Sequence, residues 1–307
     1  MKRKMQWIII SLVGLGLVLL GIDFLYSLVV RSRLAAWEDD LVRGPDGVVA
    51  GCEPFEMGEG KTALLLVHGF SDSPALFNKM APALAEQGFY CRAIRLPGWA
   101  EPMDRLGGVK REDWLKAVEL GVTDLRDASY DHVVVLAHSL GAACALELAA
   151  RARIRADALV ILAPMLKVSD RRSPVLSSRT WHEVGKWILP FTRSLESSFP
   201  VDQHDPEGRD DNHRDRFIPR SVYDELFALI DSLAGRAGEI HLPVLMVLSE
   251  EDQVIDYAYA EDYFNQLDTD DKKLVTLKNS GHVIPLDYDW EMVVGLTVEF
   301  VKEHAGE

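Results

Sequence analysis

The sequence has 307 residues, of which 48% are hydrophobic and 26% are charged. This composition supplies enough apolar material for a large core and excludes collagen-like, disordered and disulfide-scaffold proteins. The formal net charge of −15 argues against nucleic acid as a partner, because a nucleic-acid-binding protein needs a basic surface for the phosphates.

The chain begins with a long apolar segment. Residues 5–30 contain one charged side chain, Asp23, and their length exceeds the roughly 18 residues that a membrane-spanning helix requires. Between Trp7 and Tyr26 such a helix would measure about 28 Å at about 1.5 Å per residue, so both aromatic side chains would lie at the membrane interfaces. We therefore expect residues 7–26 to contact the membrane, with Asp23 reaching the outer interface.

Basic residues at the start of the chain predict its orientation. Residues 2–4 are all basic and slightly outweigh Arg31 and Arg33, which favours a cytoplasmic N-terminus with the rest of the chain on the non-cytoplasmic side. A cleaved signal peptide is the alternative and would make the protein secreted. We favour the uncleaved anchor, because no small-x-small cleavage site follows the apolar run closely and the Leu-Ala-Ala sequence at residues 34–36 lies late.

After this segment, short apolar runs alternate with helical patterns. We predict buried strands over residues 62–68, 90–95, 132–137, 156–162, 243–248 and 273–277. We predict helices over residues 74–87, 111–128, 139–151, 257–267 and 290–304. This alternation is typical of an α/β protein with a mostly parallel, doubly wound sheet that helices cover on both faces.

One long interval interrupts the alternation. Residues 165–239 contain no strand-like run of comparable strength, and they include a polar stretch at residues 202–216. An insertion of this length predicts a lid over the carboxyl ends of the strands, where such sheets bind ligands. The predicted divisions are an anchor (1–30), a linker with the first strands (31–61), a first core part (62–164), the lid (165–239) and a second core part (240–307).

A serine lies between a predicted strand and a predicted helix. Ser139 is the centre of the sequence A-H-S-L-G at residues 137–141, where small residues stand two positions before and after it. That spacing suits the sharp turn that exposes a nucleophilic serine. The alternative is a serine that only caps the helix.

The loop after the first strong strand offers the second part of a catalytic site. It reads H-G-F-S-D-S-P at residues 68–74. In a hydrolase, this loop and the residue after the nucleophile supply backbone N–H groups to the oxyanion, so we predict Phe70 and Leu140 as the donors. His68 and His138 are interpreted as residues that brace their turns rather than as bases.

The acid and the base are expected after the lid, in the order serine, acid, histidine. The loop S-E-E-D-Q-V at residues 249–254 offers Asp252, with Glu251 as the alternative. His282 follows a glycine after one more strand and can take the serine proton, while a carboxylate on its other nitrogen orients the ring. We expect activity to fall below neutral pH as His282 becomes protonated.

Together these motifs make the chain resemble α/β-hydrolases of the serine esterase and monoacylglycerol lipase type. The resemblance runs from about residue 62 to the C-terminus through HGFSDSP, LPGW, AHSLGA, SEEDQV and SGHVIPLD. It implies an α/β-hydrolase fold with a lid after the sixth strand, and a carboxylic ester hydrolase that needs no cofactor. It assigns nucleophile, acid and base to Ser139, Asp252 and His282. Trp99 departs from the histidine that often follows Leu-Pro-Gly in this family, which bears on the substrate pocket.

Aromatic residues of the lid predict an apolar entrance that suits an acyl lipid such as a monoacylglycerol. The candidate pocket residues are Phe70, Trp99, Trp181, Trp187 and Phe191. The alternative is that these side chains only pack the lid onto the core. A thioesterase, a peptidase or a cofactor-free haloperoxidase would use the same triad. A non-catalytic membrane-bound binding protein is a further alternative, but such a protein has no need of an intact triad.

The sequence gives no strong indication of a metal site. Cys52, Cys91 and Cys144 show no C-x-x-C spacing. The polar stretch 202–216 is interpreted as a solvated loop in which arginines pair with acids. Its potential metal ligands are Asp202, His204, Asp205, His213 and Asp215, and its arginines are Arg209, Arg214 and Arg216.

Because the anchor precedes the resembling region, we expect removal of residues 1–30 to abolish membrane association and leave the chemistry intact.

Overall fold

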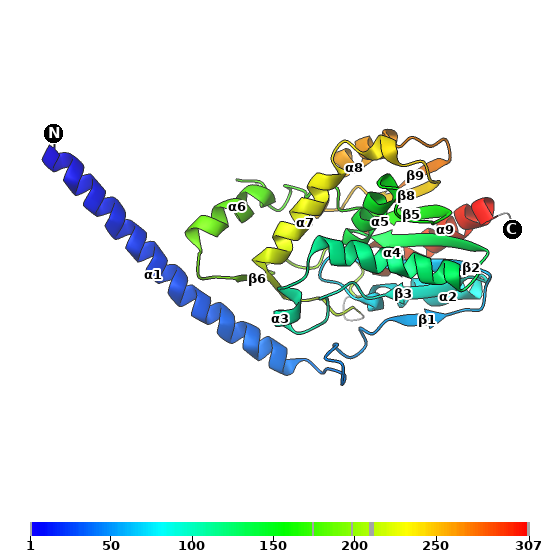
Figure 1. Cartoon of the computed structure of the whole chain (residues 1–307), viewed down its shortest axis with the longest axis horizontal. Helices are drawn as coiled ribbons and strands as arrows, with labels where there is room; N and C mark the ends of the chain where they lie inside the picture. Colours follow the sequence, from blue (N-terminus) through cyan, green and yellow to red (C-terminus); the bar gives the residue numbers. More distant parts are fainter. Residues whose placement is uncertain (1, 174, 198, 209–211, 306–307) are drawn as a thin grey trace.

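The computed structural model describes residues 2–173, 175–197, 199–208 and 212–305. In this part of the chain, a seven-stranded sheet has the spatial order β1-β3-β2-β4-β5-β8-β9 (Figure 1). The strands are β1 (Phe55–Met57), β2 (Thr62–Val67), β3 (Tyr90–Ile94), β4 (His132–His138), β5 (Ala158–Leu162), β8 (Val244–Ser249) and β9 (Lys272–Leu277). The pairings from β3 to β9 are parallel and only β1 runs antiparallel, so the predicted mostly parallel sheet is confirmed.

Helices cover both faces of the sheet, which explains why the central strands are apolar on both sides. On one face, Leu65 of β2 belongs to a buried cluster with side chains of α4, α5, α7 and α8. On the other face, Leu64 and Leu66 pack in a cluster with α2 and α9. The bounds of these helices are α2 (Met80–Glu86), α4 (Arg111–Asp127), α5 (Leu140–Ala150), α7 (Arg220–Leu233), α8 (Tyr257–Asn265) and α9 (Trp290–Ala305).

Short helices complete the loops of the core. They are η1 (Pro74–Phe77), α3 (Met103–Leu106), η2 (Ala237–Glu239) and η3 (Ile284–Leu286). The predicted helix over residues 74–87 is therefore divided into η1 and α2. The other predicted helices, and all six predicted strands, agree with the structure to within about two residues at each end.

The lid differs from its predicted form in two respects. It follows the fifth strand rather than the sixth, because only the short edge strand β1 precedes β2 among the described residues. It also contains two strands, β6 (Ser194–Glu196) and β7 (Phe217–Pro219), which pair in antiparallel orientation between α6 (Ser178–Ile188) and α7. The three-residue strands were too short to produce a recognisable pattern in the sequence.

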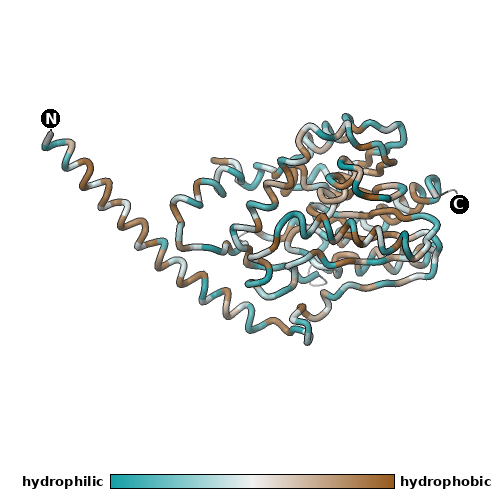
Figure 2. Tube along the Cα trace, in the orientation of Figure 1, coloured by the Kyte–Doolittle hydropathy of each residue, from teal (hydrophilic) through white to brown (hydrophobic). Residues whose placement is uncertain are grey.

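The N-terminal segment forms one helix, α1 (Lys2–Asp40), which is long and apolar enough to cross a membrane. Its first half projects away from the rest of the chain (Figure 1), and hydrophobic residues are spread along it (Figure 2). The helix continues to Asp40, so residues 31–40, expected to belong to a linker, are helical. Asp23 does not reach toward an interface as expected, because it is buried, with an exposed fraction of 1%.

Candidate active site

The turn after β4 holds Ser139 in a strained backbone conformation. Its φ of 51° and ψ of −110° lie outside the regions that side chains prefer, as expected of a serine on a sharp strand-to-helix turn. A Cβ on Gly141 would lie 2.6 Å from the carbonyl oxygens of His68 and Val67, so this position requires glycine. Ser139 makes no side-chain capping bond to α5, and the helix-cap alternative is therefore wrong.

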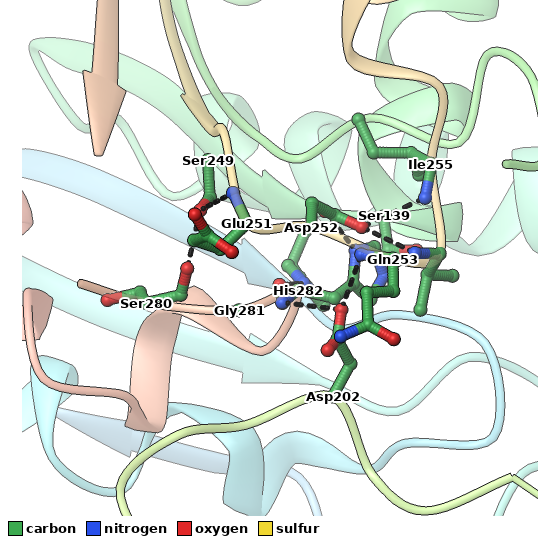
Figure 3. Close-up of polar contacts among 12 residues, drawn as sticks. Ser139, Asp202, Ser249, Glu251, Asp252, Gln253, Ile255, Ser280, Gly281 and His282 are labelled. Carbon is green, nitrogen blue, oxygen red and sulfur yellow. Dashed lines mark hydrogen bonds and ion pairs between the residues drawn. The ribbon is translucent and has the colours of Figure 1, made fainter. Parts of the chain in front are cut away.

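Ser139, His282 and Asp252 form one hydrogen-bonded chain (Figure 3). Ser139 Oγ lies 2.9 Å from His282 Nε2, and His282 Nδ1 lies 2.7 Å from Asp252 Oδ2. With Nδ1–H donated to the carboxylate, Nε2 is free to accept the serine proton. Three loops that are far apart in the sequence, each following a strand, thus bring the predicted nucleophile, base and acid to one point.

The surroundings of Asp252 favour its ionised form. Its other carboxylate oxygen accepts hydrogen bonds from the backbone N–H groups of Val254 (2.7 Å) and Ile255 (2.9 Å). Burial opposes ionisation, but the charge and hydrogen bond of His282, together with these N–H groups, outweigh it and hold the pKa of Asp252 below its usual value. Glu251 is exposed, so Asp252 and not Glu251 contacts the ring of His282.

The loop after β2 lies directly against the nucleophile. A Cβ on Gly69 would lie 3.1 Å from the Cβ of Ser139 and 2.8 Å from Nδ1 of His138, which leaves room only for glycine. Leu140 is the first residue of α5, where backbone N–H groups have no partner within the helix. The assignment of Phe70 and Leu140 as oxyanion donors is compatible with these positions and stays a prediction.

His68 and His138 brace the two turns. His68 Nε2 accepts the N–H of Leu96 at 3.0 Å, while Nδ1 lies 2.9 Å from the carbonyl oxygen of Gly69. His138 Nε2 lies 2.9 Å from the carbonyl oxygen of His282, which fixes the loop that carries the base. Burial lowers the pKa of His68 to about 4, and burial with the nearby charge of His282 lowers the pKa of His138 to about 3. Both rings are thus neutral at neutral pH.

The polar stretch 202–216 is not the solvated loop that the sequence suggested, because several of its side chains are buried. Asp202 accepts hydrogen bonds from the backbone N–H groups of Gln253 (2.8 Å) and His282 (3.2 Å), so a lid residue ties the acid loop to the base loop (Figure 3). Sequence reasoning missed this role. The buried polar residues of the stretch are Asp202, Gln203, Asp205, Asn212 and Asp215.

The end of the same stretch holds the loop after β2. The N–H of Asp215 donates to the carbonyl oxygen of Ser71 at 2.9 Å, and Arg214 Nη2 lies 3.2 Å from Ser71 Oγ. Arg214 and Asn212 also bind the buried carboxylate of Asp72, at 3.2 and 3.0 Å. Lid residues therefore contact both the base loop and the candidate oxyanion loop.

Among the described residues, the candidate metal ligands of this stretch do not form one group, although His213 and Asp215 pair with each other. Asp202 pairs with Arg172 at 3.2 Å, and Asp205 pairs with Lys79 at 3.3 Å. His204 Nδ1 lies 2.8 Å from the carbonyl oxygen of Asn279, and His213 Nε2 lies 3.0 Å from Asp215. Arg214 and Arg216 pair with Asp72 and Glu196 instead of with acids of the predicted set, and Arg209 lies outside the described residues.

A cavity of about 950 Å³ opens between the lid and the triad. Phe70, Trp181 and His282 are among the residues that line it, so the cavity reaches the catalytic base. Apolar lid side chains form much of the wall, including Leu195, Phe199, Ile218, Leu226 and Phe227.

Three of the predicted pocket residues do not line this cavity. Trp99 has no exposed surface and lies behind Phe70, with ring centroids 4.7 Å apart. Trp187 is 85% exposed and points to solvent, whereas Phe191 packs against Phe24 of α1. Trp187 and Phe191 were predicted from their residue type and place in the lid, and Trp99 from the resemblance, and neither source says which way a side chain faces.

The fold, and the hydrogen-bonded chain from Ser139 through His282 to Asp252, are those of an α/β-hydrolase. Residues 58–289 match the family described as serine aminopeptidase, S33, and the chain belongs to that family.

Similar proteins are named as esterases and lipases. A carboxylesterase of Bacillus subtilis is 26% identical over 252 residues, covering 82% of this chain and 96% of the relative. A thermostable monoacylglycerol lipase of a Bacillus species is 29% identical over 259 residues, covering 84% of this chain and 98% of the relative. The structure of a metagenome-derived lipolytic enzyme has a TM-score of 0.71 and 20% identity, covers 84% of this chain and all 100% of its own, and supports the fold.

Proposed function

We propose that the chain hydrolyses carboxylic esters through an acyl-enzyme on Ser139. The observation that carries this proposal is the continuous hydrogen-bonded chain from Ser139 Oγ through His282 to Asp252, with distances of 2.9 and 2.7 Å. His282 takes the serine proton as Oγ attacks the ester carbonyl, and then gives this proton to the departing alcohol. In the second half-reaction His282 activates water, and the acid product leaves Ser139.

An oxyanion forms in both half-reactions and needs hydrogen-bond donors that are already in place. We assign this role to the backbone N–H groups of Phe70 and Leu140. Loss of such a donor typically raises the barrier by about 2.7 to 4 kcal/mol. Because the donors are in the main chain, alanine substitutions would leave them present.

The proposed substrates are esters of acyl lipids, such as monoacylglycerols. The cavity that reaches His282 has mainly apolar lid side chains on its wall, which suits an acyl chain. A monoacylglycerol lipase is among the relatives that cover most of this chain. A thioesterase would use the same triad and is the second candidate. Because the family description is serine aminopeptidase, a peptide-like substrate is also included in the substrate panel below.

We further propose that α1 is an uncleaved membrane anchor with the catalytic part on the non-cytoplasmic side. The apolar first half of the helix and the basic residues 2–4 support this orientation. The contacts of Asp23 with the lid also favour retention of the helix. N-terminal sequencing of the membrane fraction, with protease protection of spheroplasts, tests both statements. Secreted protein that starts after residue 30 would contradict the anchor.

A fluorophosphonate probe tests the serine hydrolase assignment on the full chain in mild detergent. We expect labelling of the wild type, none of Ser139→Ala, and normal labelling of Ser232→Ala, whose hydroxyl lies in α7 and donates to Leu229. Absence of labelling in a wild type that melts cooperatively would contradict the proposed chemistry.

Substrate class is then separated by a panel of p-nitrophenyl esters from C2 to C16, a monoacylglycerol, an acyl thioester and an aminoacyl anilide. We expect the highest kcat/KM for medium or long acyl esters, because the cavity wall is apolar. A preference for C2 to C4 esters would contradict the lipid substrate and leave a short-chain carboxylesterase. A preference for the thioester or the anilide would replace the ester assignment.

A further inference from the structure

The second half of α1 presents a narrow buried stripe to the rest of the chain. Asp23, Ser27 and Val30 are buried, and Leu34 and Trp37 are partly buried, whereas most other residues of the helix are exposed. The spacing of three or four residues places these side chains on one face of the helix. The helix packs by this face against α6 and β6 of the lid (Figure 1).

Asp23 makes the central contact of this stripe. Its carboxylate accepts the backbone N–H of Phe191 at 2.7 Å and the hydroxyl of Thr192 at 2.6 Å. Arg220, at the start of α7, is near enough for its charge to interact with Asp23. The only charged residue of the apolar segment 5–30 thus secures the lid turn between α6 and β6.

A second group of contacts lies further along α1. Arg33 pairs with Glu196 of β6 at 2.9 Å, and Arg216 binds the same carboxylate at 2.7 Å. Trp37 packs on Phe217 of β7 and stacks on His213, with ring centroids 5.7 and 6.1 Å apart. One helix therefore contacts both strands of the lid hairpin.

These lid segments also form the cavity and hold the active-site loops. Leu195, Glu196 and Ile218 of the hairpin line the cavity. The neighbouring residues Arg214 and Asp215 bind Ser71, next to the candidate oxyanion donor Phe70. A displacement of the hairpin would therefore change the cavity wall first and the oxyanion loop second.

We propose that α1 is a structural part of the lid, in which Asp23 is a positioning residue that fixes the cavity wall for long acyl substrates. Asp23 does not touch the reacting atoms and acts through Phe191 and Thr192. Removal of its carboxylate leaves the Phe191 N–H and the buried Thr192 hydroxyl without their acceptor, which favours an open or displaced lid turn. The proposal can be tested by the structure of the lid and by kinetics. The kinetic test rests on the proposed ester hydrolysis, whereas the structural test does not.

The structural test is hydrogen exchange of the full chain in lipid nanodiscs. Asp23→Leu removes both acceptors and keeps the helix apolar, and Thr192→Val removes one donor without changing α1. Asp39→Asn is the matched control, because Asp39 is an exposed acid on the same helix. We expect exchange at residues 189–197 to increase about tenfold or more in Asp23→Leu, less in Thr192→Val, and not in Asp39→Asn.

The kinetic test compares a long-chain ester with p-nitrophenyl acetate. We expect Asp23→Leu to raise KM for the long ester about tenfold, with kcat/KM for the acetate changed less than about twofold. Unchanged exchange and unchanged KM in both lid variants would overturn the proposal. If Asp23→Leu does not fold, Thr192→Val decides by the same criteria. Failure of the wild type to react with fluorophosphonate would refute the proposed function, while hydrogen exchange would still decide the role of Asp23.

Discussion

The triad and the lid are held in place by different kinds of contact. Ser139, Asp252 and His282 each follow a strand of the central sheet, so the backbone hydrogen bonds of the sheet position them. Within the lid, α7 packs on the sheet in the buried apolar cluster, whereas the polar stretch 202–216 is tied to the active-site loops by side chains that bind distant backbone groups, as Asp202 does to the His282 N–H and Arg214 to the Phe70 carbonyl oxygen. The sheet therefore positions Ser139, Asp252 and His282, whereas a few polar side chains hold the stretch 202–216 against the loops that carry them.

The largest effect is expected in the triad. Asp252→Asn should lower kcat by about four orders of magnitude, because an amide cannot hold His282 in the tautomer that accepts the serine proton. Glu251→Gln is the matched control, since Glu251 is the neighbouring carboxylate and is exposed. Stopped-flow or steady-state assays with a p-nitrophenyl ester measure both variants. Equal losses in the two variants would contradict the assignment of the acid.

A smaller effect is expected where the lid touches the triad. Asp202→Asn weakens the charged acceptor of the Gln253 and His282 N–H groups, so kcat should fall about tenfold to a hundredfold with little change in KM. The pH profile of kcat should change as well. A variant that only loosened the structure would keep the wild-type pH profile. A variant with normal kcat would show that the sheet alone fixes the base loop.

Acidification tests the buried histidines of the core. The pKa values of His68 and His138, about 4 and about 3, lie below the value of about 6.5 expected in the unfolded chain. The unfolded state therefore binds more protons, and the free energy of unfolding should fall as pH decreases from about 6.5 to 4. Each ring contributes up to about 1.4 kcal/mol per pH unit.

Denaturant titrations of the full chain in detergent at pH 7.5, 6 and 5 measure this slope. His138→Gln should reduce the slope, whereas His241→Gln, at an exposed position, should leave it unchanged. An identical slope in His138→Gln and the wild type would contradict the buried neutral state of this ring.

The smallest effect is expected on the lid surface. Trp181 lines the cavity, and its replacement by alanine should raise KM for a monomeric long-chain ester several-fold through lost apolar contact. Trp187 does not line the cavity, and Trp187→Ala should change KM less than about twofold. A larger effect at Trp187 than at Trp181 would show that the substrate binds on the outer side of the lid.

The contrast between local motifs and long-range contacts also explains what could be predicted from the sequence. Strand ends carry short motifs in which neighbouring residues produce the geometry, and from these motifs Ser139, Asp252 and His282 could be predicted to lie together, as the structure places them. The roles of Asp202 and Asp23 depend on partners far away in the chain, at His282 and Thr192, and no local pattern reports such partners. Only the isolation of Asp23 in an apolar helix hinted at a buried partner.

Trp99 and Trp187 show what the sequence could not predict about aromatic side chains. Both are aromatic residues near predicted functional segments, yet one is enclosed in the core and the other faces solvent. The sequence identifies these side chains as large and apolar. Whether each one faces the core, the cavity or solvent depends on tertiary packing. The predicted strands needed no such information, since burial on both faces is visible in their composition.

The continuity of α1 limits how its length can vary. At about 3.6 residues per turn, inserting one residue rotates everything beyond it by about 100° around the helix axis. An insertion between Asp23 and Trp37 would turn one of these side chains away from the lid, because both now share a face. An insertion before Asp23 would leave this register intact and change only the segment that precedes the lid contacts. Close homologues that keep the same lid contacts should therefore differ in length before Asp23 and not after it.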